Sequence, residues 1–364
     1  MSDASTRHLI EMYMEEAEAP MFLSGFFRSP PQNFHSSEMI EIDIERDEEE
    51  IAIVVTDLTT GGRLNESSLY TNKGFTPPVF DEKGPISAYS LIKREPGRSP
   101  FLEPEFGAHA TRQAFRIFRK LEKKIRRSIE LMSSQVLQTG ALTLIDKSGT
   151  ALYELDFQAK ATHLPTVSVA WGTEVSGERT DDPLGDVASL AQVVRRDGKR
   201  KPNRLVFGTQ AYRHFISHPA VLKALDNRSM ALGSIAPETR GEGATFMGWV
   251  WIGHYRFEMW TYDGFYKHPQ TGALTDYVDE DNVIMLSDGA RLDLSYGAIP
   301  MIGERDPRAL PFLPPRMSNS DRGLDLTTNA WISEDNKQLM VSAGTRPLTI
   351  PTAIDTFGCL TTTV

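Results

Sequence analysis

The residues of this sequence that could perform acid–base or metal chemistry are few and scattered. Of the eight histidines, only His214 and His218 have the i, i+4 spacing that places two imidazoles on one helix face, as in many zinc sites. No acid lies between them, as a zinc protease helix would require, and Pro219 follows directly. We therefore expect a solvated histidine pair and no metal site.

Carboxylates and known catalytic motifs give no better candidate. The acidic run at residues 47–50 and the acidic cluster at residues 276–281 lack the spacing that arranges oxygen ligands around calcium, so we predict solvated turns. The sequence has no glycine-rich phosphate loop, no H-E-x-x-H and no G-x-S-x-G motif. The single cysteine, Cys359, excludes an intrachain disulfide and fits a reducing cytoplasm. We expect no catalytic residue, no cofactor and no metal.

Aromatic side chains recur through residues 249–262, WVWIGHYRFEMWTY. Such a series could form a platform on which nucleic-acid bases stack. The same alternation is typical of strands that face a core, and we favour the core.

The most distinctive element is one long predicted helix, from about Ala108 to Thr139. Apart from one apolar stripe, this helix is basic: residues 108–138 hold eight Lys or Arg and two acids. Gly140 ends it. At 1.5 Å per residue the helix is about 48 Å long, enough to span a whole subunit. Apolar residues recur in steps of three and four and form one stripe: Ala110, Ala114, Phe115, Phe118, Leu121, Ile125, Ile129, Met132 and Val136.

The basic face of this helix is the one candidate surface for nucleic acid. It would contact phosphates without reading sequence, since no base-reading motif accompanies it. A helix face that is solvated or paired with carboxylates explains the same pattern equally well. The candidate residues are Arg116, Arg119, Lys120, Lys123, Lys124 and Arg127.

The elements before this helix begin with an arm. Residues 6–18 predict a short amphipathic helix that Pro20 ends. An apolar segment follows that a short terminal arm could not bury alone, so we expect it to dock on another surface. Its candidate contact residues are Phe22, Leu23, Phe26 and Phe27.

Two strands and a long loop follow the arm. Residues 39–45 alternate isoleucines with charges, as in a half-buried strand, and residues 51–58 predict its antiparallel neighbour. About 18 polar, Gly-containing and Pro-containing residues then form a loop long enough to be functional or disordered. Residues 86–92 resume extended structure. The loop has few residues that could anchor it on a partner: Leu64, Leu69, Tyr70 and Phe75.

After the long helix, residues 141–157 predict two strands around a turn at 147–149, and residues 165–170 a further strand. A helix, strand, helix, helix series over 183–196, 204–207, 209–217 and 219–225 indicates a compact α/β unit. More strands follow at 245–261, 283–286 and 291–295. The last 40 or so residues, rich in Thr, Val and Ile, predict strands that return to the first unit. We therefore infer an α+β fold of two units, the second inserted in the first.

Composition fits a soluble globular protein. The 364 residues are 40% hydrophobic and 24% charged. No apolar run is long enough for a membrane span, and the N-terminal residues predict no signal peptide. The net charge of -10 is concentrated in residues 1–60, which hold 14 acids and three bases. Such asymmetry could orient a subunit between neighbours, although a solvated acidic face explains it as well.

The order of these elements resembles the major capsid proteins of tailed double-stranded DNA phages, with the Hong Kong 97-type shell fold. It is more specifically similar to the lambda-like capsid protein E family. Three stretches carry the likeness: MFLSGFFR at 21–28, KGFTPPVFDEKGPISAYSLIKRE at 73–95, and the C-terminal segment from NAWISEDNKQ onward. Residues 175–305 match in layout only.

The resemblance implies an N-terminal arm (1–37), a peripheral domain (38–174) with an extended loop (56–78) and a spine helix (108–139), an axial domain (175–305), and returning peripheral strands (306–364). The loop, including Lys73, would lie over a neighbouring subunit, since burial against a partner stabilises such a segment.

By the same resemblance, the chain would form hexamers and pentamers of a phage head that encloses double-stranded DNA. It would be assembled in the host cytoplasm with a scaffold protein in trans, a portal and a decoration protein. The alternatives are an encapsulin-like compartment and a cytoplasmic nucleic-acid-binding protein that uses the basic helix.

Overall fold

The fold of this chain comes from a computed structural model. The described residues are 21–37, 39–44, 71–92, 106–225, 233–239, 243–299, 307–309 and 325–364. The predicted helix at 6–18, the predicted strand at 51–58 and most of the 56–78 loop lie outside these residues.

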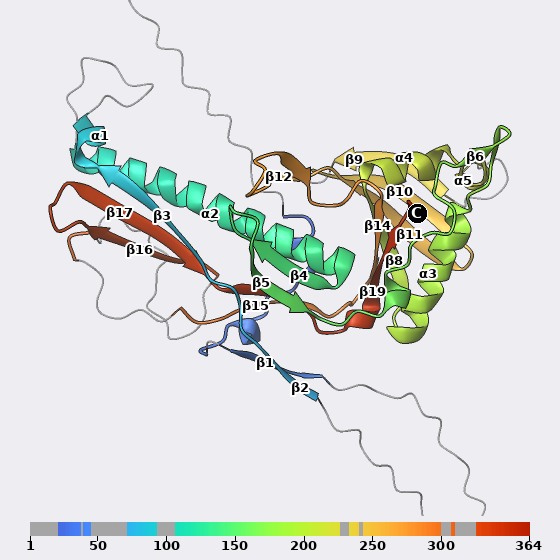
Figure 1. Cartoon of the computed structure of the whole chain (residues 1–364), viewed down its shortest axis with the longest axis horizontal. Coiled ribbons are helices and arrows are strands. Elements are labelled where there is room, and N and C mark those ends of the chain that lie inside the picture. Colours follow the sequence, from blue (N-terminus) through green and yellow to red (C-terminus); the bar gives the residue numbers. More distant parts are fainter. Residues whose placement is uncertain are drawn as a thin grey trace, which may run out of the picture.

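A single helix, α2 (Phe106–Thr139, 34 residues), runs along the long axis of the molecule (Figure 1). This confirms the predicted long helix, and eight of its nine stripe residues are buried. Phe115 is the exception at 36% exposure, because it lies at the edge of the stripe and Ile117 packs on the core in its place. Gly140 follows α2 with a φ of 66°, a conformation that glycine adopts without strain.

A three-stranded antiparallel sheet packs against the first half of α2. Its order is β16 (Thr327–Ile332), β17 (Gln338–Thr345) and β3 (Phe80–Ser87). Because β17 pairs with β3 along all eight residues, the C-terminal segment returns to the first unit as predicted. A two-stranded ladder of β15 (Leu292–Tyr296) and β18 (Pro347–Pro351) continues this layer.

The predicted extended segment at 86–92 is wrong beyond Ser87. The helix α1 (Ala88–Ile92) starts there. The Ser87 hydroxyl accepts a hydrogen bond from the Ser90 N–H at 3.1 Å, and this side-chain cap turns the chain out of the strand.

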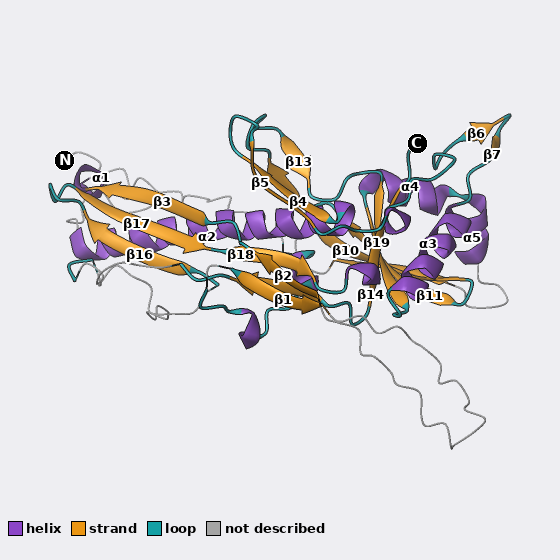
Figure 2. Ribbon diagram, turned by 60° about the horizontal axis from the view of Figure 1, so that its bottom comes forward, coloured by secondary structure: helices purple, strands orange, loops and turns teal. Residues whose placement is uncertain are grey.

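The second unit is an α/β layer at the other end of the molecule (Figure 2). Its helices are α3 (Pro183–Asp197), α4 (Thr209–Ser217) and α5 (Pro219–Leu225), close to the predicted ranges. In its six-stranded sheet only β8 and β11 pair in parallel. The order is β19 (Phe357–Thr361), β14 (Asn282–Ser287), β8 (Pro202–Phe207), β11 (Tyr255–Tyr262), β10 (Ala244–Ile252) and β9 (Gly233–Thr239).

Two predictions for this region differ from the structure. The last strand, β19, does not join the first unit but pairs with β14, because its apolar residues are buried inside the α/β layer. Residues 165–170 form no strand; Thr166 makes only an isolated bridge to Thr361 at the outer edge of β19.

Four hairpins complete the described fold. They are β1 (Ile40–Ile44) with β2 (Thr71–Phe75), β4 (Ala141–Ile145) with β5 (Ala151–Asp156), β6 (Glu174–Val175) with β7 (Glu178–Arg179), and β12 (Phe265–Lys267) with β13 (Leu274–Asp276).

The β4–β5 hairpin confirms the predicted turn at 147–149. The β2 strand lies in the segment predicted as loop, so part of that loop is a partner of β1.

The two units share one hydrophobic core. Ile129 and Met132 of α2 belong to the same buried cluster as Tyr262 of β11 and Ile284 of β14. The two units are therefore packed together, and the inserted unit is not an independent domain joined only by a linker. Among the described helices, none has the length and apolar character needed to cross a membrane.

Candidate assembly surfaces

The apolar arm docks on its own chain. Leu23 and Phe27 are 0% and 5% exposed, and Phe22 packs on Trp260 and Tyr262 with ring centroids 5.3 Å apart. Phe26 meets Phe22 edge to face at 5.1 Å. We expected this segment to need another surface, and the structure supplies it from α2 and the α/β sheet, so its burial requires no neighbouring subunit.

One buried carboxylate fixes this arm. Glu130 of α2 is 0% exposed and accepts hydrogen bonds from the N–H groups of Leu23 and Ser24 at 2.7 and 2.9 Å. The hydroxyl of Tyr262 donates to the same carboxylate at 2.8 Å. These N–H groups open the short 3-10 turn η1 (Ser24–Phe26). Glu130 therefore joins the arm, the long helix and the α/β sheet at one point.

Burial has the largest effect on the pKa values of Glu130 and Tyr262. It raises the pKa of Glu130 above its usual value, and the three donated hydrogen bonds only oppose that shift. The pKa of Tyr262 is also raised, first by burial and then by the nearby Glu130 carboxylate. The sequence showed Glu130 as one of two acids on a basic helix, but only the tertiary contacts show what it binds.

The base of the extended loop is also held by its own chain. In the β1–β2 hairpin, Phe75 pairs with Ile40 and Lys73 with Ile42. The half-buried Phe75 ring packs on Phe157 at 5.7 Å, and the Tyr153 hydroxyl donates to the Thr76 carbonyl at 2.8 Å. Phe75 thus belongs to the fold of its own subunit. Leu64, Leu69 and Tyr70 lie outside the described residues.

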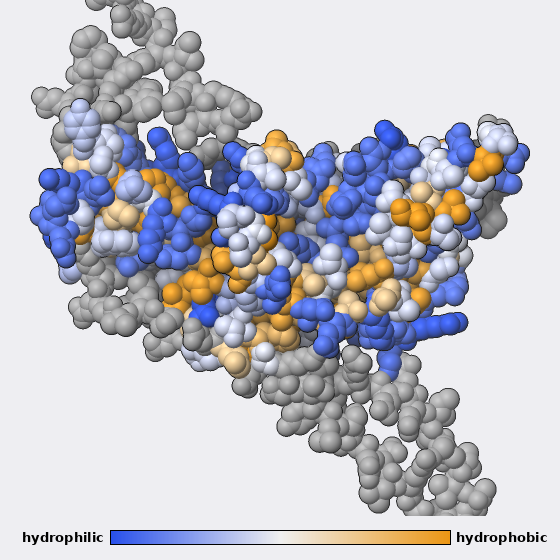
Figure 3. Space-filling view, viewed as in Figure 1, coloured by the Kyte–Doolittle hydropathy of each residue, from blue (hydrophilic) through white to orange (hydrophobic). Residues whose placement is uncertain are grey.

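The basic face of α2 is largely turned to solvent. Arg116, Arg119, Lys120 and Lys124 are exposed, whereas Lys123 and Arg127 are half-buried. Lys124 pairs with Glu82 at 2.5 Å. In the view of Figure 3, hydrophilic side chains cover much of the half of the molecule that contains α2.

Arg126 differs from its basic neighbours on this helix. Its two terminal nitrogens, Nη1 and Nη2, both donate to the carboxylate of Asp325, which is 199 residues away in the sequence. The hydrogen bond from Nη1 is 2.6 Å long. Arg126 also lies 3.6 Å from Glu122. The Arg126 guanidinium therefore joins α2 to the residues just before β16, and it is not part of the exposed face.

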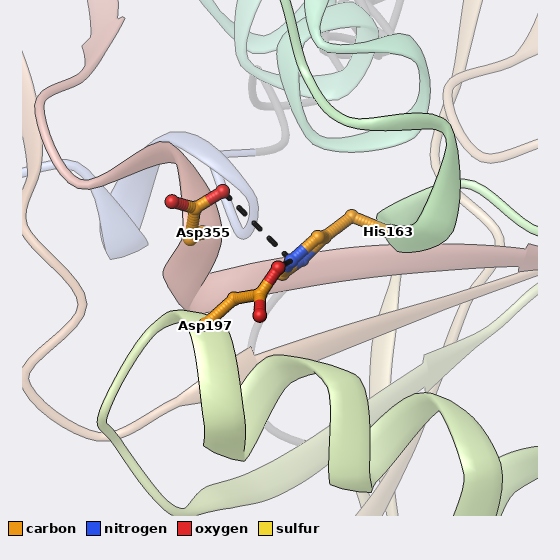
Figure 4. Close-up of side chains that lie close together, drawn as sticks. All are labelled: His163, Asp197 and Asp355. Atoms are coloured by element: carbon orange, nitrogen blue, oxygen red, sulfur yellow. Dashed lines mark hydrogen bonds and ion pairs between the residues drawn. The ribbon is translucent and has the colours of Figure 1, made fainter.

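A histidine and two aspartates meet where α3 ends and β19 begins (Figure 4). The Nε2 atom of His163 lies 3.3 Å from Asp197 and 3.8 Å from Asp355. Lys160 lies 2.8 and 3.4 Å from the same two carboxylates, and its hydrogen bond is the first cause that lowers the pKa of Asp197. This donor set could hold a metal, but the lysine ammonium already supplies the positive charge.

The predicted solvated histidine pair is wrong. His218 is 8% exposed, and its Nε2 atom lies 3.1 Å from the Asp181 carbonyl oxygen, because Pro219 starts a new helix that turns the ring inward. His214 lies on α4 beside Gly172.

The aromatic series is core as predicted for four of its residues, while Trp249 is half-buried and Trp251 is exposed. The core residues are Tyr255, Phe257, Trp260 and Tyr262.

Comparison with protein families gives a match over nearly the whole chain, residues 6–361, to the model of phage major capsid protein E. The chain belongs to this family. It is a structural component of the phage head shell and not an enzyme, which confirms both predictions from the sequence.

One solved capsid protein shows the same fold. The putative capsid protein of a prophage of E. coli CFT073 has a TM-score of 0.62 at 16% identity, with 94% of this chain and 93% of that chain covered. The SrpI encapsulin of Synechococcus elongatus PCC 7942 has a TM-score of 0.48 at 10% identity, covering 100% and 96%. Comparison with curated proteins gave no match. The expected α+β class and Hong Kong 97-type fold are thus confirmed for this capsid protein.

Proposed function

We propose that this capsid protein forms hexamers and pentamers of an icosahedral head that encloses packaged double-stranded DNA. The observation that carries the proposal is the division of α2 into two faces. One face is buried against the sheets, and the other presents Arg116, Arg119 and Lys120 to solvent. A long rigid helix with such a face can lay positive charge against phosphates or against an acidic scaffold without reading sequence.

The two units take separate roles in this proposal. The sheet β16–β17–β3, the β15–β18 ladder and α2 make the peripheral domain, and the six-stranded sheet with α3, α4 and α5 makes the axial domain near the capsomer centre. The β1–β2 register supports the role of the extended loop. Because Phe75 at one end of the hairpin is held by its own chain, we propose that the residues between Ile44 and Thr71, at the other end, contact a neighbouring subunit.

We further propose the partners that the resemblance to lambda-like capsid proteins implies. A scaffold protein acts in trans during assembly in the host cytoplasm, a portal occupies one vertex, and a decoration protein clamps the mature shell. The family match favours a phage head over a protein-filled compartment, because the matched model is that of a phage capsid protein.

The test is the content of assembled particles. The capsid protein, produced during phage growth and purified by sedimentation, should give closed particles whose double-stranded DNA survives added nuclease. Particles filled with protein and free of DNA would support the compartment instead, and a chain that only binds DNA without closing into shells would support the nucleic-acid-binding alternative.

A further inference from the structure

The α/β unit carries opposite charges at its two ends. At one end, the β6–β7 hairpin presents five consecutive exposed residues, from Glu174 to Glu178. Two of them are glutamates, and Val175 between them is 57% exposed. In Figures 1 and 2 this hairpin projects beyond the helices of the unit.

The base of this hairpin is rigid. Arg179 donates two hydrogen bonds to the buried carboxylate of Asp181, at 2.7 and 2.8 Å, and a third to the His214 carbonyl at 3.4 Å. The Asp181 carboxylate also accepts from the Gly172 N–H at 3.2 Å. At the tip, Ser176 and Gly177 have φ angles of 56° and 83°, which close a tight turn. The hairpin is thus held in one orientation while its tip contacts solvent.

The opposite end of the unit is basic. The last turn of α3 and the loop after it expose four basic side chains, and the one acid among them, Asp197, is already paired with Lys160. The exposed bases are Arg195, Arg196, Arg200 and Lys201. The 15 residues of α3 separate the two ends by about 22 Å. Figure 3 shows hydrophilic side chains along this lower edge of the unit.

We propose that the β6–β7 hairpin of one copy docks on the basic end of α3 in the next copy around a capsomer. This contact rests on the proposed function, since it requires rings of this chain. The two surfaces are different patches of the same molecule and have opposite charge. Such a head-to-tail contact repeats around a rotation axis and closes into a ring. Complementary charge sets its direction and excludes hairpin-to-hairpin pairing, because like charges repel.

A disulfide between copies tests the contact directly. The native chain has one cysteine, Cys359, which is buried, so new exposed cysteines report without interference. Assembled particles of the double variant Glu178→Cys/Arg196→Cys, treated with a mild oxidant, should give a ladder of bands that ends at the hexamer and pentamer. Particles with either cysteine alone, or with the control pair Glu178→Cys/Lys267→Cys, should stay largely as single chains.

Charge exchange gives a second, independent readout. Glu174→Lys/Glu178→Lys and Arg195→Glu/Arg196→Glu should each raise the protein concentration needed for assembly by ~10-fold or more. Combining all four changes should restore assembly, since the contact then has both charges reversed. A matched reversal elsewhere, Lys147→Glu/Lys267→Glu, should have no such effect.

The outcomes separate this contact from the proposed function. Intact shells that give no ladder, or assembly that the combined variant does not restore, would overturn the contact and leave the capsid role standing. A native chain that forms no closed particle during phage growth would contradict the proposed function itself and the contact with it. If added DNA fragments bind the basic end of α3 more tightly than the hairpin of a neighbouring copy does, that end is a nucleic-acid site and the proposed contact is wrong.

Discussion

The backbone N–H of Leu23 donates to the carboxylate of Glu130 at 2.7 Å, across 107 residues of sequence. The same carboxylate accepts from Tyr262, so one side chain of the long helix holds the N-terminal arm and the α/β sheet together. This carboxylate therefore ties the arm to both units of the fold.

Removing this carboxylate should loosen the arm. In Glu130→Ala, three donors at a buried site lose their acceptor, and the free energy of unfolding of the subunit should fall by about 3 kcal/mol. Chemical denaturation measures this loss of stability. Limited proteolysis should also remove the arm faster than in the native chain. Glu154→Ala, at an exposed position of β5, is the control; an equal effect in both variants would contradict the role of Glu130.

The same residue predicts a pH dependence. Burial raises the pKa of Glu130 in the folded chain, so the folded state holds this proton more tightly than the unfolded state. Its contribution to stability is full at acid pH and is lost as the pH rises through the raised pKa, above about 4.5. Subunit stability in the native chain should show this decline, and Glu130→Ala should lack it. A decline of equal size in the variant would assign it to another group.

We propose different roles for two parts of the segment 56–78. Phe75 packs on Phe157 within one subunit, so Phe75→Ala should lower the free energy of unfolding of the subunit by about 2 kcal/mol. Leu69→Ser/Tyr70→Ser should leave subunit melting unchanged but prevent stable shells. The measurements are thermal melting of the dissociated subunit and electron microscopy of particles. Normal shells from the Leu69 and Tyr70 variant would contradict the intersubunit role of the loop.

The exposed face of α2 should act through charge alone. Arg116→Glu/Arg119→Glu/Lys120→Glu should change the free energy of unfolding of the subunit by less than about 0.5 kcal/mol. It should reduce assembly or the amount of nuclease-protected DNA per particle. Arg126→Ala gives the opposite pattern, a loss of subunit stability, because Asp325 loses its partner. Unchanged assembly and DNA content in the triple variant would rule out an electrostatic role for this face.

The cluster of His163, Asp197 and Asp355 should not take up zinc. Because the Lys160 ammonium already forms ion pairs with both carboxylates, at 2.8 and 3.4 Å, excess zinc should leave the melting temperature of the native subunit unchanged. Lys160 also holds the pKa of Asp197 low, so this pair stabilises the fold above the unfolded pKa and less as the pH falls through the lowered one. Lys160→Ala should flatten that acid decline by less than about 1 kcal/mol. A zinc-dependent rise in the native melting temperature would reveal a metal site.

The sequence predicted those parts of the fold that rest on local periodicity. The stripe of α2, the turn after β4 and the helices of the α/β unit follow from the spacing of residues within each segment. It could not predict pairings set by distant residues, such as Glu130 with Leu23 or Arg126 with Asp325. The placement of β19 was missed because an apolar strand fits either unit, and only its neighbour β14 decides between them.

The candidate surfaces, too, could be predicted only where they rest on a pattern within one segment. The basic face of α2 was visible as a helical pattern, and most of it is exposed. The apolar arm was predicted to dock on a surface outside itself, but the sequence cannot show that Trp260 and Tyr262 cover Phe22. The basic end of α3 was overlooked, although the run RRDGKRK at 195–201 is plain in the sequence.

The most direct test of the capsid role is an electron cryomicroscopy reconstruction of particles purified from phage growth. We expect closed icosahedral shells of this one chain in hexamers and pentamers, with the β6–β7 hairpins toward each capsomer centre and the exposed face of α2 on the inner surface. Particles without closed symmetry, or shells in which this chain is absent, would contradict it.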